Sequence, residues 1–353
     1  MDISHLIDDL NDKQREAVSA GLTNILVLAG AGSGKTRVLV HRIAWLIEVE
    51  KLSPFNILAV TFTNKAAHEM KTRIASMIGM RANTMWGGTF HGLAHRILRA
   101  HWEPAGLAKN FQIIDSNDQF RLIRRIIREK QLDEAKWPPR QAQSYINQKK
   151  DHGLRPDDIK GTHDHFESVM QNIYEQYEAI CQKSGLVDFA EMLLRAYDVL
   201  RKHEDIKQHY QKRFRYILVD EFQDTNTLQY NWLRLLATPQ NNTMIVGDDD
   251  QSIYSWRGAR VDNIHRFEKD YPEVKTIRLE QNYRSTGHIL SAANQLIANN
   301  SNRLGKNLWT ASGDGERISL YAAFNDTDEA RFIISRIKKW RDDNGSLSEC
   351  AIL

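Results

Sequence analysis

The chain has 353 residues, of which 41% are hydrophobic and 26% are charged, and its formal net charge at pH 7 is +3. This length exceeds that of one ordinary compact domain, so we expect two or three domains. The apolar runs are too short to cross a membrane, the N-terminus is acidic rather than signal-like, and Cys181 and Cys350 lack the spacing of a zinc site. We therefore expect a cytoplasmic protein without a membrane partner, whose mild positive charge allows nucleic-acid binding.

Four short apolar runs predict the strands of a parallel α/β sheet. They cover residues 25–29, 57–62, 216–220 and 244–247, and each ends in glycine or polar residues. Segments with helical spacing follow the first two runs. In such a sheet the ligand site lies at the carboxyl ends of the strands, so we expect the functional residues to gather there.

The pattern of strands and helices also predicts a division of the chain. Amphipathic helices dominate between about residues 90 and 212, which indicates a helical insertion within the sheet domain. We predict a discontinuous nucleotide-binding domain from residues 1–89 and 213–278, the insertion at 90–212, and the start of another domain at 279–353. Within this last part, we expect a helix at 286–300 and strands at 317–321 and 350–353.

Residues 29–36, Ala-Gly-Ala-Gly-Ser-Gly-Lys-Thr, lie between the first strand and a helix and predict a phosphate-binding loop. Backbone N–H groups at the start of the helix would hold the phosphates of ATP, with Lys35 on the β and γ oxygens and Thr36 on Mg²⁺. A glycine-rich turn without a ligand is the alternative, which the Lys-Thr ending disfavours. The candidate nucleotide contacts of this loop are Ala31, Gly32, Ser33, Gly34, Lys35, Thr36 and Arg37.

Four further residues are candidates for the chemistry of ATP hydrolysis. Asp220 and Glu221 end a predicted strand, where Asp220 would bind Mg²⁺ and Glu221 would polarise the attacking water. Gln251 follows another strand and is a candidate sensor of the γ-phosphate. Arg284 is a candidate arginine finger from outside the sheet domain, although without a family resemblance an ordinary surface arginine is the favoured interpretation.

These segments, taken in chain order, resemble the motifs of superfamily 1 DNA helicases of the UvrD/Rep family. The matching segments are residues 10–14, 29–36, 61–67, 88–92, 220–224, 247–257 and 281–284. The resemblance implies recombinase-like motor domains, named 1A and 2A, with insertion 1B, and ATP- and Mg²⁺-dependent movement in the 3′→5′ direction on single-stranded DNA. It also implies unwinding at single-strand/duplex junctions, with proteins of mismatch and excision repair as partners and self-association of the intact protein.

The resemblance further implies that Gln14 recognises adenine and that Tyr283 stacks on it. A glutamine amide offers both a donor and an acceptor to the adenine edge. The alternative is structural, because Asn11 and Gln14 also have the spacing of a capping box at the start of a helix. Both interpretations stay open from the sequence.

Aromatic and basic residues inside the matching motifs are the candidates for DNA binding. Phe62, Tyr254 and Trp256 would stack on bases, whereas packing in the core is the usual fate of large apolar side chains. The further candidates for DNA contact are Asn64, Lys65, His91 and Arg257.

Two other patterns have competing interpretations. Residues 121–128 carry four arginines opposite an apolar helix face, which indicates either a phosphate-binding surface or a solvated one. His91 and His95 are four residues apart on a predicted helix, but no third zinc ligand is evident, so we expect no metal other than Mg²⁺.

The chain ends before the positions of the family's motifs V and VI, and motif VI supplies a second arginine to the γ-phosphate. An ATP- and DNA-binding module without movement is therefore one alternative. The helicase arm of a recombination helicase–nuclease is another. A GTPase switch is disfavoured because residues 64–67, Asn-Lys-Ala-Ala, lack the acidic residue of a guanine-reading motif.

Overall fold

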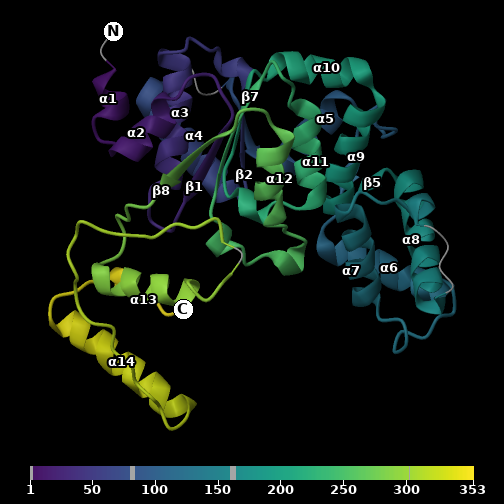
Figure 1. The fold of residues 1–353 in the computed structure, drawn as a ribbon. Helices are drawn as coiled ribbons and strands as arrows, with labels where there is room; N and C mark the ends of the chain where they lie inside the picture. The colour runs from purple at the N-terminus through teal and green to yellow at the C-terminus, as the bar shows by residue number, and fades with distance from the viewer. Residues whose placement is uncertain (1–2, 80–83, 160–163, 302) are drawn as a thin grey trace.

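The computed structural model describes residues 3–79, 84–159, 164–301 and 303–353. Within these ranges, six parallel strands form one sheet in the spatial order β3-β2-β6-β7-β1-β8 (Figure 1). The predicted fold class, a parallel α/β sheet, is confirmed. The strands are β1 (Ile25–Ala29), β2 (Ile57–Thr61), β3 (Trp86–Thr89), β6 (Tyr216–Val219), β7 (Asn242–Gly247) and β8 (Lys275–Leu279).

Helices cover both faces of this sheet, which explains why its central strands are continuous apolar runs. Along β1, Ile25, Val27 and Ala29 face one core, and Leu26 and Leu28 face the other. The first core is closed by α2 (Asp12–Ser19), α3 (Lys35–Glu48) and α4 (Asn64–Ile78). The second is closed by α5 (Phe90–Ala100), α9 (Phe189–Lys202), α11 (Thr227–Leu236) and α12 (Asp262–Asp270).

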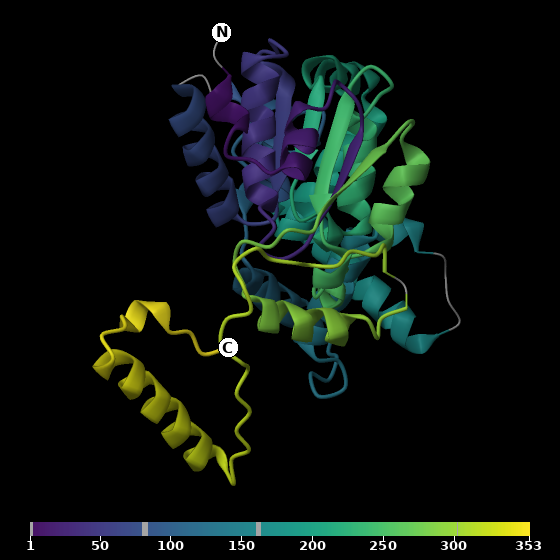
Figure 2. The ribbon, with the colours of Figure 1, turned by 60° about the vertical axis from the view of Figure 1, so that its left-hand side comes forward.

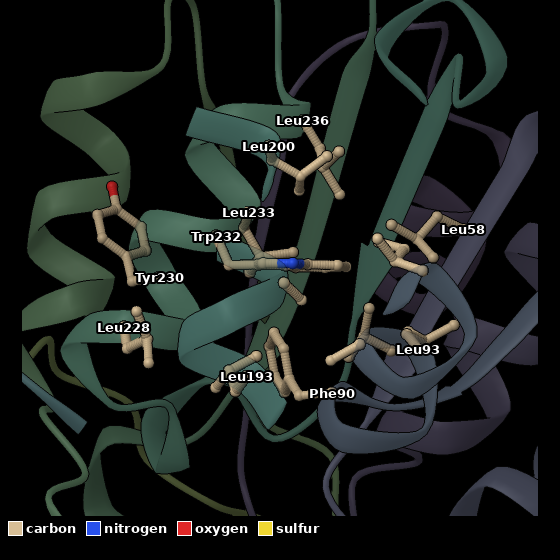
Figure 3. Close-up of a cluster of buried hydrophobic side chains, with 14 of the residues drawn as sticks. Leu58, Phe90, Leu93, Leu193, Leu200, Leu228, Tyr230, Trp232, Leu233 and Leu236 are labelled. Carbon is tan, nitrogen blue, oxygen red and sulfur yellow. The ribbon is translucent and has the colours of Figure 1, made fainter. Parts of the chain in front are cut away.

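The second core joins the helical segment to the sheet. Trp232 of α11 is buried at its centre, and its ring meets Phe90 edge-on at a centroid distance of 6.1 Å (Figure 3). Leu58 of β2 and Leu93 of α5 lie beside these rings. Packing at this point fixes the start of α5, and therefore the motif at residues 88–92, against the carboxyl end of the sheet.

A helical segment lies between β3 and β6 in the sequence and has a core of its own. Ile123, Ile146 and Tyr174 are among the buried residues of this core. In the same helical segment, the buried Lys150 ammonium pairs with Asp188 at 2.8 Å and with Glu191 at 3.2 Å. The remaining elements of the segment are β4 (Gln112–Ile113), α6 (Ser116–Glu129), α7 (Pro139–Asp151), α8 (His165–Ser184), β5 (Leu186–Val187) and α10 (Glu204–Arg213).

The chain after β8 contains α13 (Gly287–Ile297), at the place of the predicted helix, and α14 (Asp326–Asp342), which extends away from the sheet (Figure 2). The strands predicted at 317–321 and 350–353 are wrong, because neither segment is a strand in the structure. A strand needs a neighbour for its backbone hydrogen bonds, and no described segment pairs with either one. Leu320 is accordingly 98% exposed.

Near the N-terminus, the described chain begins with the short helix α1 (Ser4–Ile7). None of the described helices is both long enough and apolar enough to cross a membrane.

Candidate nucleotide site and DNA-contact surface

The phosphate loop (residues 29–36) has the backbone shape that its glycines predict. Gly32 and Gly34 have φ angles of 70° and 91°, a region that L side chains rarely adopt. A Cβ atom on Gly34 would lie 2.7 Å from Nε2 of Gln14, so a side chain would also collide there. The buried Ser33 donates its hydroxyl to the Gly30 carbonyl at 2.8 Å and closes the turn. Helix α3 begins directly afterwards, so its N-terminal N–H groups face the loop.

A cleft of about 510 Å³ opens beside this loop. It brings together predicted residues from segments far apart in the chain, namely Ala31, Gly32, Gly34, Lys35, Thr36, Arg37, Glu221, Gln251, Tyr283 and Arg284. Ser33, Asp220 and Gln14 do not line it and are buried. Two residues of α4 that the sequence analysis did not select, Glu69 and Arg73, also line the cleft and pair with each other. Their spacing of four on a helix is ordinary, so no sequence signal pointed to them.

Lys35 has the environment expected of a phosphate ligand. Its side chain is 10% exposed, and its Nζ lies 3.4 Å from Oε2 of Glu221. Among the described residues, this Nζ is one of the few buried polar atoms without a hydrogen-bond partner. A buried ammonium normally has its donors satisfied, so an unsatisfied one that lines a cleft fits an anionic ligand.

Asp220 and Glu221 diverge at the end of β6. Asp220 is buried and accepts a hydrogen bond from the Glu221 backbone N–H at 3.0 Å. Burial, and then the neighbouring Glu221 carboxylate, raise the pKa of Asp220 to about 7. A divalent cation would favour the charged form, so this carboxyl and the Thr36 hydroxyl fit Mg²⁺ as the sequence predicts.

The backbone of Glu221 is strained. Its φ and ψ angles are 47° and 48°, which is the left-handed region and uncommon for a residue other than glycine. Gln223 donates to Oε2 of Glu221 at 2.8 Å and holds the carboxylate in place beside Lys35. The strain is therefore located at the candidate general base.

Gln251 connects to the same group of residues through Asp248. The Gln251 amide donates to Oδ2 of Asp248, and the Asp248 backbone N–H donates to Oε1 of Gln223 at 2.9 Å. The candidate γ-phosphate sensor and the candidate base are thus linked through Asp248 and Gln223.

The residues after β8 are fixed to the phosphate loop by Asn282. Its amide donates to the Ala31 carbonyl at 2.6 Å, while its Oδ1 accepts from the backbone N–H of Arg284 at 2.8 Å. The N–H of Tyr283 donates to the Gly32 carbonyl at 2.9 Å. Arg284 therefore lies at the cleft. Asn282 lies in a motif that the sequence indicated, but its role in holding that motif against the phosphate loop was not predicted.

Gln14 forms the capping box. Its backbone N–H donates to Asn11 Oδ1 at 2.8 Å, and its own Oε1 accepts from the Asn11 N–H at 3.2 Å. Its Nε2 also donates to the Ser33 carbonyl at 2.9 Å, and the residue is 1% exposed. One lone pair and one N–H of the amide remain, so capping does not use its full hydrogen-bonding capacity. Recognition of adenine by Gln14 stays a prediction.

Phe62, Tyr254 and Trp256 lie in a row that we call the aromatic surface. The rings of Phe62 and Tyr254 are 5.3 Å apart, and those of Tyr254 and Trp256 are 6.4 Å apart. Trp256 is 73% exposed, so its indole is not core packing, whereas the other two are partly buried. Asn64 and Lys65 are exposed at the start of α4. The side chain of Arg257 lies outside the described residues.

Family models match nearly the whole chain. The model of the UvrD/REP helicase N-terminal domain matches residues 10–272, and that of the UvrD-like helicase C-terminal domain matches residues 277–353. The chain belongs to the UvrD/REP helicase family. This confirms the resemblance that its motifs indicated.

Curated relatives of this UvrD/REP chain include DNA helicase II of Escherichia coli K12, which is 62% identical over the whole chain. DNA helicase II of Haemophilus influenzae is 57% identical over the whole chain, and ATP-dependent DNA helicase PcrA of Staphylococcus aureus is 43% identical over 99% of it. The matches cover 49%, 49% and 48% of these relatives. The chain therefore spans about half the length of the curated relatives it matches.

His91 lies at the start of α5, with its ring edge-on to Phe189 of α9 at 6.0 Å. Burial lowers the pKa of His91, which favours the neutral form of its ring. Phe189 is 51% exposed and was not selected from the sequence. Phe189 is the first residue of α9 and directly follows Asp188, whose side chain caps the helix. At the first position of a helix, the spacing of apolar residues does not distinguish a surface aromatic from a core one.

Neighbouring side chains contact the residues of both alternative patterns. His95 accepts from Nε of Arg99 at 2.9 Å, and the described residues offer only Asp248, Asp249 and Asp250 as a cluster of three metal ligands. The arginines of α6 each have a carboxylate partner, which favours a solvated face. These pairs are Arg121–Asp118, Arg124–Glu134, Arg125–Glu129 and Arg128–Glu134.

Proposed function

We propose that this chain is the ATP-hydrolysing part of a DNA helicase that moves 3′→5′ along single-stranded DNA and unwinds duplex at single-strand/duplex junctions. The observation that carries the proposal is the buried, unsatisfied Lys35 ammonium in a cleft that also contains Glu221 and Arg284. Membership of the UvrD/REP family supports the same activity. In this proposal, residues 1–89 and 213–278 form motor domain 1A, residues 90–212 form insertion 1B, and residues 279–353 begin motor domain 2A.

Several residues in and beside the cleft have a chemical role in the proposed reaction. The phosphate loop and Lys35 bind the triphosphate, and Tyr283, 52% exposed at the cleft, stacks on the adenine. Glu221 accepts a proton from the attacking water. Gln251 and Arg284 contact the γ-phosphate and oppose the charge that develops on it. Thr36 and Asp220 would hold Mg²⁺, which neutralises phosphate charge when bound.

The aromatic surface and the cleft share one loop, which supports coupling between DNA and ATP. The same stretch that carries Gln251 at the cleft continues to Tyr254 and Trp256. A shift of this loop on hydrolysis would therefore move a base-stacking surface. Phe189 and His91 extend the proposed DNA contacts onto the helical segment.

The test of the proposed function is ATP turnover and directional movement. We expect turnover that rises with added oligo(dT), and faster release of a fluorophore from the 5′ end of a strand than from its 3′ end. Turnover and DNA binding without directional release would instead support the ATP- and DNA-binding module without movement. Absence of both nucleotide binding and DNA binding would overturn the proposal.

Trp256→Ala is expected to weaken binding of single-stranded DNA by about 1–3 kcal/mol, because one stacking platform for a base is lost. ATP affinity should hardly change. Fluorescence anisotropy across a salt series measures this, and the mutant should keep the wild-type salt slope because stacking releases no counterions. Lys65→Ala is the control, since loss of a phosphate contact should flatten the slope. Normal DNA affinity would show that the exposed indole does not stack on a base.

Gln14→Ala is expected to narrow the difference between ATP and GTP affinities if the remaining donor and acceptor of the amide contact adenine. The same change removes the two hydrogen bonds of the Gln14 side chain, to the Asn11 N–H and the Ser33 carbonyl, so we also expect a loss of about 0.5–1.5 kcal/mol in stability for each bond. Competition with a fluorescent ATP analogue measures both nucleotides. Equal loss of affinity for ATP and GTP, together with lower stability, would leave Gln14 with the capping role alone.

The partners and location are proposals that rest on the family. We propose a role in mismatch and nucleotide excision repair, with repair proteins as partners, self-association of the intact protein and a cytoplasmic location. Deletion of the gene tests the repair role: the expected result is a raised spontaneous mutation rate and ultraviolet sensitivity, and wild-type levels of both would contradict it.

A further inference from the structure

Lys306 is a buried lysine that the sequence analysis did not select. It is 5% exposed, and its ammonium lies 2.6 Å from Asp248, 2.6 Å from Asp249 and 2.7 Å from Asp250. The three carboxylates form the cluster that would otherwise suit a metal ion, and the ammonium fills it. Burial opposes the charge of Lys306, but the carboxylates outweigh it and raise the pKa of the ammonium.

We call the contact between Lys306 and the three carboxylates of residues 248–250 the junction. Further contacts strengthen it. Arg303 forms two hydrogen bonds to the Asp250 carboxylate, both at 2.8 Å, and the Leu304 N–H donates to Asp249 at 2.8 Å. Such a paired and hydrogen-bonded arrangement offsets the cost of removing the charges from water. The junction therefore holds one defined geometry between the loop after β7 and the chain that follows α13.

Asp248 is the member of this cluster that touches the candidate catalytic residues. Its Oδ1 accepts from Lys306, and its Oδ2 accepts from the Gln251 amide. Its backbone N–H contacts Gln223, whose amide in turn holds Glu221 at 2.8 Å. Asp248 thus connects Lys306 to the candidate sensor through its carboxylate and to the candidate base through its backbone N–H and Gln223.

The other end of the same segment reaches the remaining two loops of the cleft. We call residues 303–309 the bridging segment. They belong to the coil that follows α13, which passes below the sheet in Figure 2. The Trp309 carbonyl accepts from the Asn282 N–H at 2.7 Å. Leu308 lies against Gly30 of the phosphate loop, where a Cβ atom would collide with it. The bridging segment therefore contacts the loop of Gln251, the phosphate loop and the loop of Arg284.

We propose that Lys306 is a positioning residue for ATP hydrolysis, which holds Asp248 so that Gln251 and Glu221 stay aligned with the phosphates bound at Lys35. The inference rests on the proposed function and assigns to it a residue that does not line the cleft and acts through Asp248. Misplacement of a catalytic group by about 1 Å can reduce a rate on the order of a hundredfold, so the effect of losing this anchor is measurable.

The test uses a charge-balanced variant, because Lys306→Met alone leaves three largely buried carboxylates short of a cation, which destabilises the fold. The double variant Lys306→Met/Asp249→Asn keeps the net charge of the cluster, and it keeps Asp248 as the acceptor for Gln251. Asp249→Asn alone serves as its reference. Lys275→Met is the matched control. Lys275 is the first residue of β8, its side chain is 45% exposed, and it pairs with Glu16 of α2.

We expect the double variant to lose ATP turnover by on the order of ten- to a hundredfold in kcat, with little change in KM, ATP affinity or melting temperature. Amide hydrogen exchange of residues 248–257 should be faster than in the Lys275→Met control. Wild-type kcat with wild-type exchange would overturn the inference. A joint fall in melting temperature and ATP affinity would overturn it as well, because it would indicate a purely structural residue.

The exchange measurement needs no turnover, so the two proposals fail separately. A wild-type chain that does not hydrolyse ATP would contradict the proposed function. Unchanged exchange in the double variant would contradict the anchoring of the loop by Lys306, whatever the activity of the wild type.

Discussion

Lys35→Ala is expected to abolish most ATP turnover, by on the order of a hundred- to a thousandfold, because it removes a preorganised cation from the position of the phosphates. The ammonium is buried, has no hydrogen-bond partner in the part of the chain that the structure describes and lies 3.4 Å from Glu221, so the nucleotide-free protein gains little from it. We therefore expect the melting temperature without nucleotide to stay the same or rise. Release of phosphate and thermal melting in the presence and absence of ATP measure the two effects.

The control for this variant is Lys13→Ala, which removes an exposed lysine of α2 whose ion-pair partner within the described ranges is Glu16. ATP should raise the melting temperature of the wild type and of this control, since a ligand that binds the folded state stabilises it by mass action. The Lys35→Ala protein should lose most of that shift. Unchanged turnover in Lys35→Ala would show that residues 29–36 do not bind the reacting phosphates.

The sequence predicted the central strands of the sheet but not two others. β1, β2, β6 and β7 are buried on both faces and therefore read as continuous apolar runs. β3, Trp-Gly-Gly-Thr, contains two glycines, and β8 is half exposed at the edge of the sheet. Strand propensity and apolar runs do not mark such segments, whose pairing depends on neighbours that are distant in the sequence.

The wrong strands at 317–321 and 350–353 show the reverse error. Both segments have apolar residues of strand type, but propensity does not supply a neighbouring strand. Ile318 is 61% exposed and Ile352 is 72% exposed, so neither buries the surface that would stabilise a sheet. The local pattern of apolar residues predicted a strand correctly only where the described chain also supplied a neighbouring strand on both sides.

The candidate site was predictable where its chemistry is local. The phosphate loop and the pair Asp220-Glu221 each place reactive groups within a few residues. Spacing predicts the loop, and the acidic pair becomes a candidate once that loop is present. The contributions of Asn282 and Lys306 were not predictable in this way. Asn282 acts through a carbonyl 251 positions away, and Lys306 acts through a carboxylate 58 positions away, so only the fold brings each pair together.

Glu221→Gln is expected to keep ATP binding and to lose hydrolysis by on the order of a hundred- to ten-thousandfold, the usual contribution of a general base. The amide has the size of the carboxylate, so the left-handed backbone at Glu221 and the hydrogen bond from Gln223 can both persist. It cannot accept the proton of the attacking water. Equilibrium binding of a fluorescent ATP analogue and single-turnover hydrolysis separate the two steps.

Glu268→Gln is the matched control, because this exposed carboxylate of α12 contacts only Thr276 at 3.1 Å among the residues described. It should keep both binding and turnover. If Glu221→Gln lost ATP affinity and turnover to the same extent, the carboxylate would be needed to hold Lys35 rather than to accept a proton. The base would then have to be sought among the other acids of the motif. Asp224 is the first candidate, since burial, and then the charge of Glu221, raise the pKa of its carboxyl to about 6, closer to the range in which a general base works at neutral pH.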